Sequence, residues 1–286
     1  MYESFYGLRE KPFNLTPDPR FLFLSPAHRD AIAYVTYGLR EKRGFLALTG
    51  QVGVGKTTVV RKVFQEMGPT VDRAFVLNTK LTFKQMLGLV LDEFGMGMKG
   101  KSKAELLIEF NNFLVSQLRA GRNTVIVIDE AHNLSPAALE ELRMLSNLET
   151  DTEKLVQILL VGQNELVDIL DRLELRQLRQ RIPGVFNIGP LSAGEVKGYV
   201  EFRLDVAGRS GGNPSFSEDS FEYIFGETGG IPRLINLLCD CALLVGYVEG
   251  SLAVDRRILE EASKELGKFR SPIGIDDRLP RASLSP

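Results

Sequence analysis

The chain has few of the residues that build disulfide frameworks and zinc sites. Its 286 residues include two cysteines, Cys239 and Cys241, and two histidines, His28 and His132. Cysteines two positions apart on a helix point to different faces and are poorly placed to pair. We therefore expect both to be plain buried thiols of a reducing compartment. A zinc site would also need more ligands, so a disulfide-stapled fold and a zinc site are both disfavoured.

An excess of charge of one sign is also missing. The 35 Lys and Arg residues nearly balance 37 Asp and Glu residues, for a formal net charge of −2. Such a chain has no global attraction to nucleic acid or anionic lipid, so any binding of that kind has to come from a local patch.

Long apolar runs are absent too. The N-terminus mixes both charge signs and lacks the apolar segment of a signal peptide. The most apolar late stretch, LINLLCDCALLVGYV, is interrupted by Asp240 and is too short to span a bilayer comfortably. We expect a cytoplasmic protein with no membrane span, which could still dock at the inner face of the cytoplasmic membrane through a partner.

What the chain does have is an alternation of short apolar runs with helical patterns. Five runs read as strands, at 45–49, 73–78, 124–129, 155–162 and 184–189. Strands that alternate with helices predict an α/β fold with a parallel sheet covered on both faces. After the fifth run the strand signals stop, and four helical patterns follow.

These patterns divide the chain into four parts. Residues 1–26 are expected to form an extended segment, because their prolines forbid a long helix. Residues 27–190 form the α/β domain, and residues 191–267 form a small all-helical domain. The tail, 268–286, carries proline, serine and charge and is expected to be disordered.

The stretch GQVGVGKTT, residues 50–58, matches the phosphate-binding pattern G-x-x-x-x-G-K-[ST]. It follows an apolar strand and opens a helix, so its backbone N–H groups can surround phosphates at the positive helix end. Lys56 is expected to reach the β- and γ-phosphates, and the Thr57 hydroxyl to ligate Mg²⁺. ATP is the expected ligand, although the motif does not distinguish ATP from GTP. The residues expected at the phosphates are Gly50, Gln51, Val52, Gly53, Val54, Gly55, Lys56, Thr57 and Thr58.

A second motif, VIVIDEAH, ends the third apolar run with Asp129 and Glu130. Carboxylates at the carboxyl edge of a parallel sheet face the crevice where ligands bind. Asp129 is expected to hold the Mg²⁺ through its water shell. Glu130 is expected to polarise the attacking water, as a general base or as an orienting group, which favours hydrolysis over passive nucleotide sensing.

The loop, the Asp-Glu pair and the helical second domain together resemble the AAA+ ATPases. More narrowly, the chain resembles the ExeA/GspA branch, the general secretion pathway protein A ATPases, over about residues 3 to 266. Four stretches carry the narrower resemblance: FYGLREKPFNLTPDP, GFLALTGQVGVGKTT, ILLVGQNEL and GGIPRLINLLCDCALL. The resemblance implies a P-loop NTPase with an AAA+ core and a helical lid. ExeA-type proteins continue into a transmembrane helix and a peptidoglycan-binding domain; this sequence departs from that pattern, and we expect a short form.

The resemblance also implies roles for residues outside the two motifs. Gln163, at the end of the fourth strand, takes the place of sensor 1, which faces the γ-phosphate; most relatives outside the branch use Asn there, so Asn164 stays the alternative. Arg233 in GIPR takes the place of sensor 2 on the lid. An arginine in the first turn of a helix opposes the helix dipole unless an anion compensates. We interpret His132 as structural rather than catalytic.

The stretch LRQLRQRIPG precedes the fifth strand, where AAA+ proteins carry an arginine finger that reaches the γ-phosphate of a neighbouring subunit. Arg181 is the first choice for this role and Arg179 the second, while Arg176 resembles a helix-surface charge. A finger that acts in trans makes hydrolysis depend on oligomerisation. We therefore expect a homo-oligomer.

Three functions stay open. The resemblance favours a Mg-ATP-dependent ATPase that assists or regulates assembly of an envelope secretion or export machine, with a protein of that machine as partner. A DNA-associated ATPase similar to the TniB and MuB transposition helpers is second; the charge gives it no broad support, but a stripe of Arg40, Lys42 and Arg43 could contact DNA. The third is a nucleotide-gated scaffold with little turnover of its own.

Overall fold

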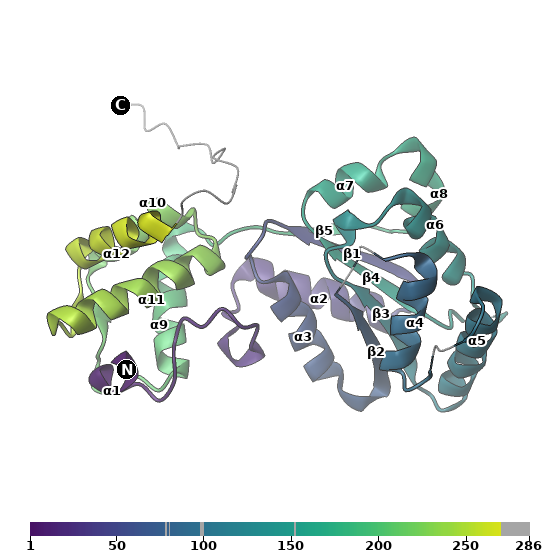
Figure 1. Cartoon of the computed structure of the whole chain (residues 1–286), viewed down its shortest axis with the longest axis horizontal. Coiled ribbons are helices and arrows are strands. Elements are labelled where there is room, and N and C mark those ends of the chain that lie inside the picture. The colour runs from purple at the N-terminus through teal and green to yellow at the C-terminus, as the bar shows by residue number, and fades with distance from the viewer. Residues whose placement is uncertain (78, 80, 98–99, 152, 270–286) are drawn as a thin grey trace.

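Two lobes make up the molecule, a sheet-containing lobe and a helical lobe (Figure 1). The computed structural model describes residues 1–77, 79, 81–97, 100–151 and 153–269. Nearly all of the tail expected to be disordered, residues 270–286, lies outside the described residues. None of the helices in the described part is long and apolar enough to cross a membrane.

The sheet contains five parallel strands, as the sequence predicted. Their order is β2-β3-β4-β1-β5, which was not predicted from the sequence. β1 and β3 both pair with β4, so the carboxyl ends of these three strands lie side by side. The strands are β1 (Phe45–Gly50), β2 (Val71–Val76), β3 (Asn123–Ile128), β4 (Gln157–Gly162) and β5 (Val185–Ile188).

Helices cover both faces of the sheet, because alternate strand residues point to opposite sides. Leu46 and Leu48 of β1 pack into the core under α2 and α3, whereas Phe45 and Ala47 pack into the core under α4, α5 and α6. Two short helices, α7 and α8, were not predicted, because one or two turns carry too little periodicity. The helices of this lobe are α2 (Pro26–Arg40), α3 (Lys56–Met67), α4 (Phe83–Glu93), α5 (Lys103–Arg119), α6 (Pro136–Leu145), α7 (Glu165–Leu170) and α8 (Arg176–Arg179).

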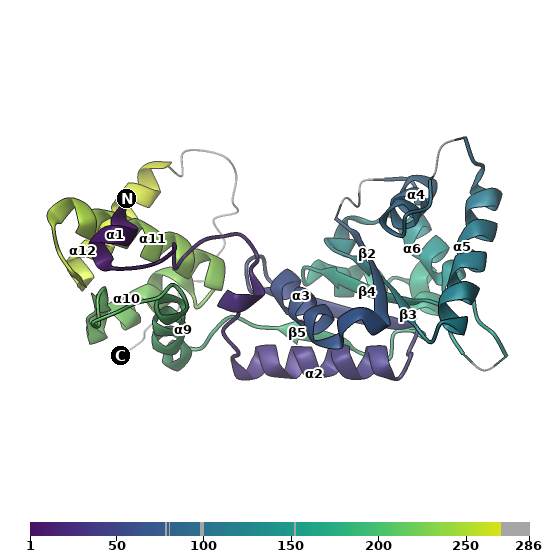
Figure 2. The ribbon, with the colours of Figure 1, turned by 90° about the horizontal axis from the view of Figure 1, so that it is seen from below.

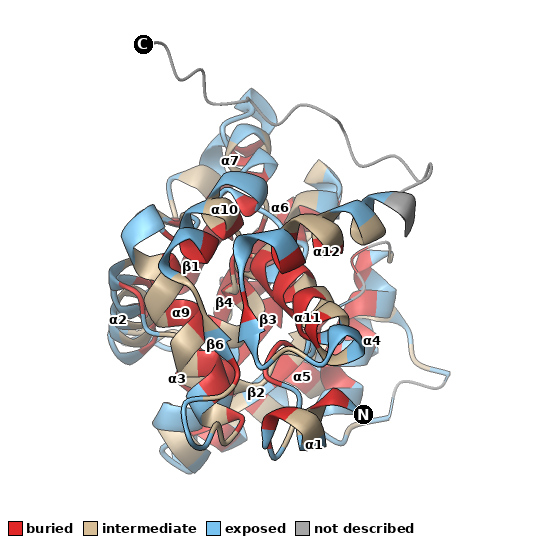
Figure 3. Cartoon of the chain, turned by 90° about the vertical axis from the view of Figure 1, so that its left-hand side faces the viewer, coloured by how far each residue is buried: buried red, intermediate tan, exposed pale blue. Residues whose placement is uncertain are grey.

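The helical lobe contains the four helices expected after the sheet, and we call it the lid. They are α9 (Ala193–Val206), α10 (Glu218–Thr228), α11 (Pro232–Glu249) and α12 (Arg256–Phe269). Their buried sides face one another around α11 (Figure 3). The lid is not purely helical, because β6 (Ser215–Phe216) pairs in parallel with β7 (Ala253–Val254). Two-residue strands have no alternation for sequence reasoning to detect.

The N-terminus packs into the lid instead of forming only an extended segment. Helix α1 (Tyr2–Tyr6) lies against α11, where the Tyr6 hydroxyl donates to the Leu243 carbonyl at 3.0 Å. Residues up to the turn at Phe21 share the lid core, and Figure 2 shows this segment running from the lid to α2. A five-residue helix fits here because it precedes the first proline. The remaining short 3₁₀ helices are η1 (Pro19–Phe21), η2 (Gly68–Thr70), η3 (Ala131–Asn133) and η4 (Leu173–Leu175).

Candidate nucleotide site

The loop between β1 and α3 presents an uncapped helix end to the space between the lobes. Gly55 has a φ of 100°, and no side chain caps the helix that begins at Lys56. The first N–H groups of α3 and its positive end can therefore face an anion. Gly53 has a φ of 85°, and a Cβ at this position would lie 2.5 Å from the Cβ of Arg233. The lid thus reaches the loop where only a glycine fits.

Lys56 is held inside this loop. Its Nζ donates to the carbonyls of Gly50 and Gln51 at 2.8 and 2.9 Å, and the residue is 7% exposed. Burial lowers the pKa of Lys56, and the charges of Glu130 and Asp129 oppose that shift. A buried ammonium bonded to neutral carbonyls gains from a nearby anion. A polyphosphate fits this requirement.

The side chains of Thr57 and Asp129 meet across the gap between α3 and the end of β3. The Thr57 hydroxyl donates to Asp129 Oδ2 at 2.7 Å, and Asp129 Oδ1 accepts the Glu130 N–H at 2.9 Å. A hydroxyl and a carboxylate are the hard oxygen ligands that Mg²⁺ prefers, and Mg²⁺ takes the rest of its shell from water and phosphate. The donor set therefore fits Mg²⁺. Within the described ranges no group of three His, Cys, Asp or Glu offers another metal site.

Glu130 adopts a backbone conformation that is unusual for a residue with a side chain. Its φ is 52°, and its carbonyl accepts the Asn133 N–H at 3.0 Å and the Thr79 hydroxyl at 3.3 Å. These bonds hold the strained residue in place. Its side chain stays 48% exposed, beside the cleft that Lys56 also lines. Sequence reasoning missed Thr79, which is buried and comes from the loop after β2.

Gln163 follows β4 and lies next to the turn that carries Glu130. Its backbone N–H donates to His132 Nδ1 at 3.2 Å, and its side-chain amide nitrogen lies 3.0 Å from His132 Nε2. Asn164, the alternative for sensor 1, turns to β5, where its Oδ1 accepts from Asn187 Nδ2 at 2.6 Å. Of these two residues, the geometry brings Gln163 toward Glu130.

Arg233 enters the site from the lid. Pro232 is the first residue of α11, and the Arg233 N–H donates to the Gly53 carbonyl at 3.1 Å. The Arg233 side chain is exposed and lines the same cleft as Lys56. A guanidinium at the positive end of a helix needs a compensating anion, and the cleft is where that anion would lie.

The cleft between the lobes has a volume of about 320 Å³. The phosphate loop and Glu130 form one wall, and Tyr199, Arg203 and Asn236 of the lid form another. A third wall comes from the N-terminal residues 14–18 and 21–23, which the sequence reading did not assign to the site. The Pro-Asp-Pro sequence predicted that no helix runs through these residues, but it did not predict that they line the cleft.

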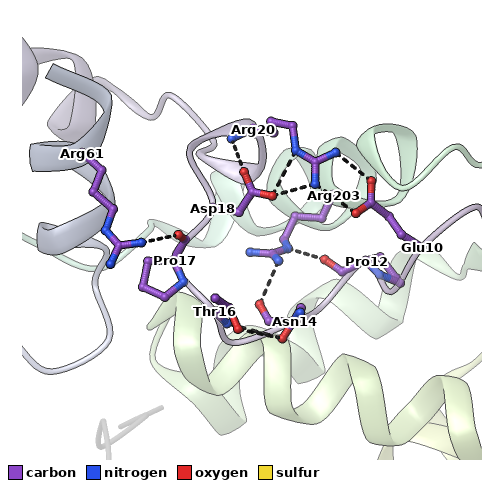
Figure 4. A network of polar contacts seen from close by, with 9 residues as sticks. All are labelled: Glu10, Pro12, Asn14, Thr16, Pro17, Asp18, Arg20, Arg61 and Arg203. Carbon is purple, nitrogen blue, oxygen red and sulfur yellow. Dashed lines mark hydrogen bonds and ion pairs between the residues drawn. The ribbon is translucent and has the colours of Figure 1, made fainter. Parts of the chain in front are cut away.

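That third wall is tied to the lid by one buried arginine, as Figure 4 shows. Arg203 is 6% exposed and donates to the Pro12 carbonyl at 2.6 Å and the Asn14 carbonyl at 3.1 Å. It also donates to the Tyr199 hydroxyl at 3.1 Å. We call residues 10–20 the N-terminal strap.

The strap is tied to the other lobe as well. Arg61 of α3 donates to the Pro17 carbonyl at 3.0 Å. Within the strap, Arg20 bonds both Asp18 and Glu10 and thereby closes the turn (Figure 4). The strap therefore bridges the lid and the helix that begins at the phosphate loop.

Arg181, the first choice for the arginine finger, is engaged within its own chain. It donates to the Arg143 carbonyl at 3.3 Å, to Ser146 Oγ at 2.9 Å and to Asn147 Oδ1 at 2.5 Å. These acceptors lie at the end of α6, where free carbonyls and the helix dipole favour a cation. Sequence spacing could not reveal this arrangement.

The two other arginines of this region differ in their freedom. Arg179 pairs with Asp171 at 2.8 Å and donates to the Ile182 carbonyl at 3.2 Å. Arg176 is exposed at the start of α8. A finger has to extend toward a neighbouring subunit, so the exposed Arg176, interpreted from sequence as a surface charge, has the freest side chain of the three.

The basic stripe considered for DNA is partly occupied. Lys42 pairs with Glu153, and the Arg43 guanidinium lies 4.8 Å from the centre of the Tyr37 ring. Arg40 ends α2 and is exposed. Side chains that already form an ion pair or a cation–π contact contribute less binding free energy to DNA phosphates.

Comparison with known proteins agrees with the geometry. A family model described as AAA domain matches residues 39–170. The chain is 41% identical over 271 residues to General secretion pathway protein A of Aeromonas hydrophila, an alignment that covers 94% of this chain and 49% of that protein. The chain therefore spans about half the length of the curated relative that it matches.

Solved structures share the fold at lower identity. The Cdc6p structure from Pyrobaculum aerophilum has a TM-score of 0.69 at 20% identity and covers 89% of this chain and 70% of its own. The Aeropyrum pernix ORC2 structure with ADPNP and ADP has a TM-score of 0.65 at 15% identity and covers 90% and 71%. A RuvB mutant of Thermotoga maritima has a TM-score of 0.58 at 16% identity and covers 91% and 74%. The chain carries an AAA domain on the fold of the AAA+ P-loop ATPases, and its resemblance to the ExeA/GspA branch is confirmed.

Proposed function

We propose that this chain hydrolyses ATP with Mg²⁺ and that hydrolysis powers or regulates assembly of a secretion or export machine of the cell envelope. One observation carries the ATPase part: Lys56 with Thr57, Glu130 and Arg233 come from three distant parts of the chain to one cleft, and Thr57 bonds Asp129. The secretion part rests on similarity to General secretion pathway protein A, which is longer than this chain.

The proposed reaction uses the chain's own groups in distinct roles. The loop N–H groups and the Lys56 ammonium bind the phosphates and orient the γ-phosphoryl group for in-line attack. Glu130 accepts a hydrogen bond from the attacking water and orients it, and Gln163 donates to the γ-phosphate. When bound between Thr57 and Asp129, Mg²⁺ would neutralise charge on the phosphate oxygens.

The lid is the element that hydrolysis would move. It touches the phosphate loop through Arg233 and Gly53 and touches α3 through the strap and Arg61. An anion in the cleft draws Arg233 inward, and its loss removes that attraction, so the nucleotide state would set the angle between the lobes. The strap and lid walls are proposed to hold the base and ribose, with ATP as the preferred nucleotide.

Lys56→Ala and Glu130→Gln test the assignment. Lys56→Ala is expected to abolish nucleotide binding, because it removes the buried ammonium. Glu130→Gln is expected to bind ATP but lower turnover by roughly 10²- to 10⁴-fold, the usual contribution of an acid–base residue. Binding and phosphate release are measured with Mg²⁺ and with a chelator. Wild-type turnover in either variant, or in the wild-type protein without Mg²⁺, contradicts the proposal.

The secretion role needs its own test. In cells lacking the gene, wild-type protein is expected to restore export across the envelope, and Lys56→Ala is expected not to restore it. The wild-type chain is also expected to sediment with membranes through a partner protein and to be released when that partner is absent. The DNA alternative predicts duplex binding that weakens steeply between 50 and 200 mM salt.

A further inference from the structure

His132 lies between two groups that belong to the site. It sits in η3 after β3, is 13% exposed in its side chain, and packs against the end of β4, where a Cβ on Gly162 would lie 3.3 Å from the His132 backbone nitrogen. Its Nε2 is 3.4 Å from Glu130 Oε2, and its Nδ1 accepts the Gln163 N–H at 3.2 Å. One imidazole thus touches the ends of two neighbouring strands.

The hydrogen bonds fix which ring nitrogen carries the proton. Nδ1 accepts from a backbone N–H, so in the neutral ring the single hydrogen is on Nε2. Nε2 then donates, and the Glu130 carboxylate and the Gln163 amide are the two groups within its reach. An amide nitrogen next to the protonated Nε2 would place two hydrogen-bond donors against each other, with no acceptor between them. The atom placed next to His132 Nε2 is the Gln163 amide nitrogen, so we assign this amide the flipped orientation, with its oxygen toward His132 and its NH₂ group directed to another acceptor.

We propose that His132 is a positioning residue for hydrolysis, which holds the Glu130 carboxylate and the Gln163 amide in one hydrogen-bonded group. The proposal rests on the proposed function, because it takes Glu130 as the water-orienting group. Glu130 is half-exposed and has three side-chain torsions, so without a partner its carboxylate samples several positions. Catalysis depends on alignment, and a shift of about 1 Å costs about 100-fold.

The same imidazole would couple the Glu130 carboxylate, which orients the attacking water, to the Gln163 amide, which contacts the γ-phosphate. A move of the Glu130 carboxylate changes the acceptor at Nε2, and this changes the hydrogen bond available to the Gln163 amide. His132 would therefore affect the chemical step and leave ground-state binding of ATP nearly unchanged, since it does not touch the phosphate loop.

Three variants separate this role from a structural one. His132→Ala removes both contacts; His132→Gln places an amide near the position of Nε2 and can still donate to Glu130; His132→Asn reaches only the position of Nδ1. We expect kcat to fall roughly 10- to 100-fold in the Ala and Asn variants and to return to within about threefold of wild type in the Gln variant. The dissociation constant for ATP is expected to change less than about twofold, as for a lost contact that acts only in the transition state.

Asn133→Ala removes an exposed side chain in the same turn and keeps the backbone N–H that bonds the Glu130 carbonyl. It is the control for the fold and is expected to keep wild-type turnover and melting temperature. Wild-type kcat in His132→Ala overturns the proposal, as do equal losses in the Gln and Asn variants. The Glu130→Gln variant distinguishes failure of the proposed function from failure of the positioning role alone. If Glu130→Gln keeps wild-type turnover, the proposed site is wrong. If Glu130→Gln loses turnover while His132→Ala keeps the wild-type kcat, only the positioning role is wrong.

Discussion

The backbone N–H of Arg233, on the lid, donates to the carbonyl of Gly53 in the phosphate loop at 3.1 Å. This one hydrogen bond joins the two lobes at the point where the phosphates are proposed to lie. The side chain of Arg233 can therefore change position without breaking the contact between its backbone and the loop.

Gly53→Ala is expected to weaken ATP binding. A Cβ would lie 2.5 Å from the Cβ of Arg233, and the left-handed φ of 85° is strained for alanine by about 1–2 kcal/mol. The loop would relieve that strain by leaving the conformation that binds phosphate, so KM is expected to rise by about tenfold. Steady-state kinetics measure it, with Gly194→Ala as a matched control, because Gly194 is exposed and has nothing near its Cβ position. Equal KM values in the two variants would contradict the role of the contact.

His28 is expected to make stability depend on pH. Its Nε2 donates to the Val54 carbonyl at 2.9 Å, and its Nδ1 lies 2.6 Å from Ser25 Oγ. Burial lowers the pKa of His28 below its ordinary value near 6.5, while the Val54 carbonyl and the charge of Glu195 oppose the shift. Below pH 6.5 the unfolded chain binds the proton and the folded chain does not, so stability falls as pH falls through the folded-state pKa.

Urea unfolding at pH 7, 6 and 5 measures this effect. The wild type is expected to lose more stability than His28→Gln over this range, because glutamine does not titrate. Carboxylates contribute equally to both proteins, so the difference between the two curves isolates the histidine. Parallel curves would show that His28 does not contribute.

Arg203→Met is expected to loosen the N-terminal strap and destabilise the lid. It removes two hydrogen bonds from a charged donor, one to the carbonyl of the buried Pro12 and one to the carbonyl of the exposed Asn14, and such bonds contribute roughly 1.5–3 kcal/mol each. The free energy of unfolding should fall by roughly 3 kcal/mol. Arg209→Ala, which breaks only a surface pair with Asp205, should change it by less than about 1 kcal/mol. Similar losses in both variants would refute a special role for Arg203.

Arg181 and Arg176, two of the three arginines shortly before β5, are expected to respond differently to substitution. Arg181→Ala should lower the melting temperature, because three acceptors at the end of α6 lose their donor. Arg176→Ala should leave the melting temperature unchanged and, if this residue completes a neighbouring site, should abolish the rise of turnover per subunit with protein concentration. Turnover per subunit, measured over a wide range of protein concentration in the wild type and in both variants, tests this prediction. A rate per subunit that is constant in the wild type argues against any finger in trans.

The parts of the fold that depend on local pattern were predictable. The helix at Lys56–Met67 and the strand at Phe45–Gly50 follow from a glycine loop between an apolar run and a helical pattern. The meeting of Thr57 with Asp129 followed from the rule that parallel strands end at one edge. Each of these predictions needed only neighbouring residues or a rule of topology.

The parts that depend on distant contacts were not predictable. The strap lines the cleft because Arg203, nearly 190 residues away, binds its carbonyls. The sequence did not show that Arg181 is bonded within its own chain, because its acceptors at the end of α6 lie more than 30 positions earlier. His132 touches Gln163 only because β3 and β4 are adjacent. Backbone acceptors leave no signature in side-chain types, so sequence reasoning had no signal to detect.

The bond from Tyr6 to the Leu243 carbonyl spans 237 positions in the chain. The lid core therefore contains residues from the start of this sequence together with nearly the last described ones. The sheet lobe can complete its own core as soon as β5 has emerged, whereas α1 has to wait with its tyrosines uncovered until α11 is made. The order of these elements along the chain thus orders their assembly: the nucleotide loop forms before the lobe that covers it can close.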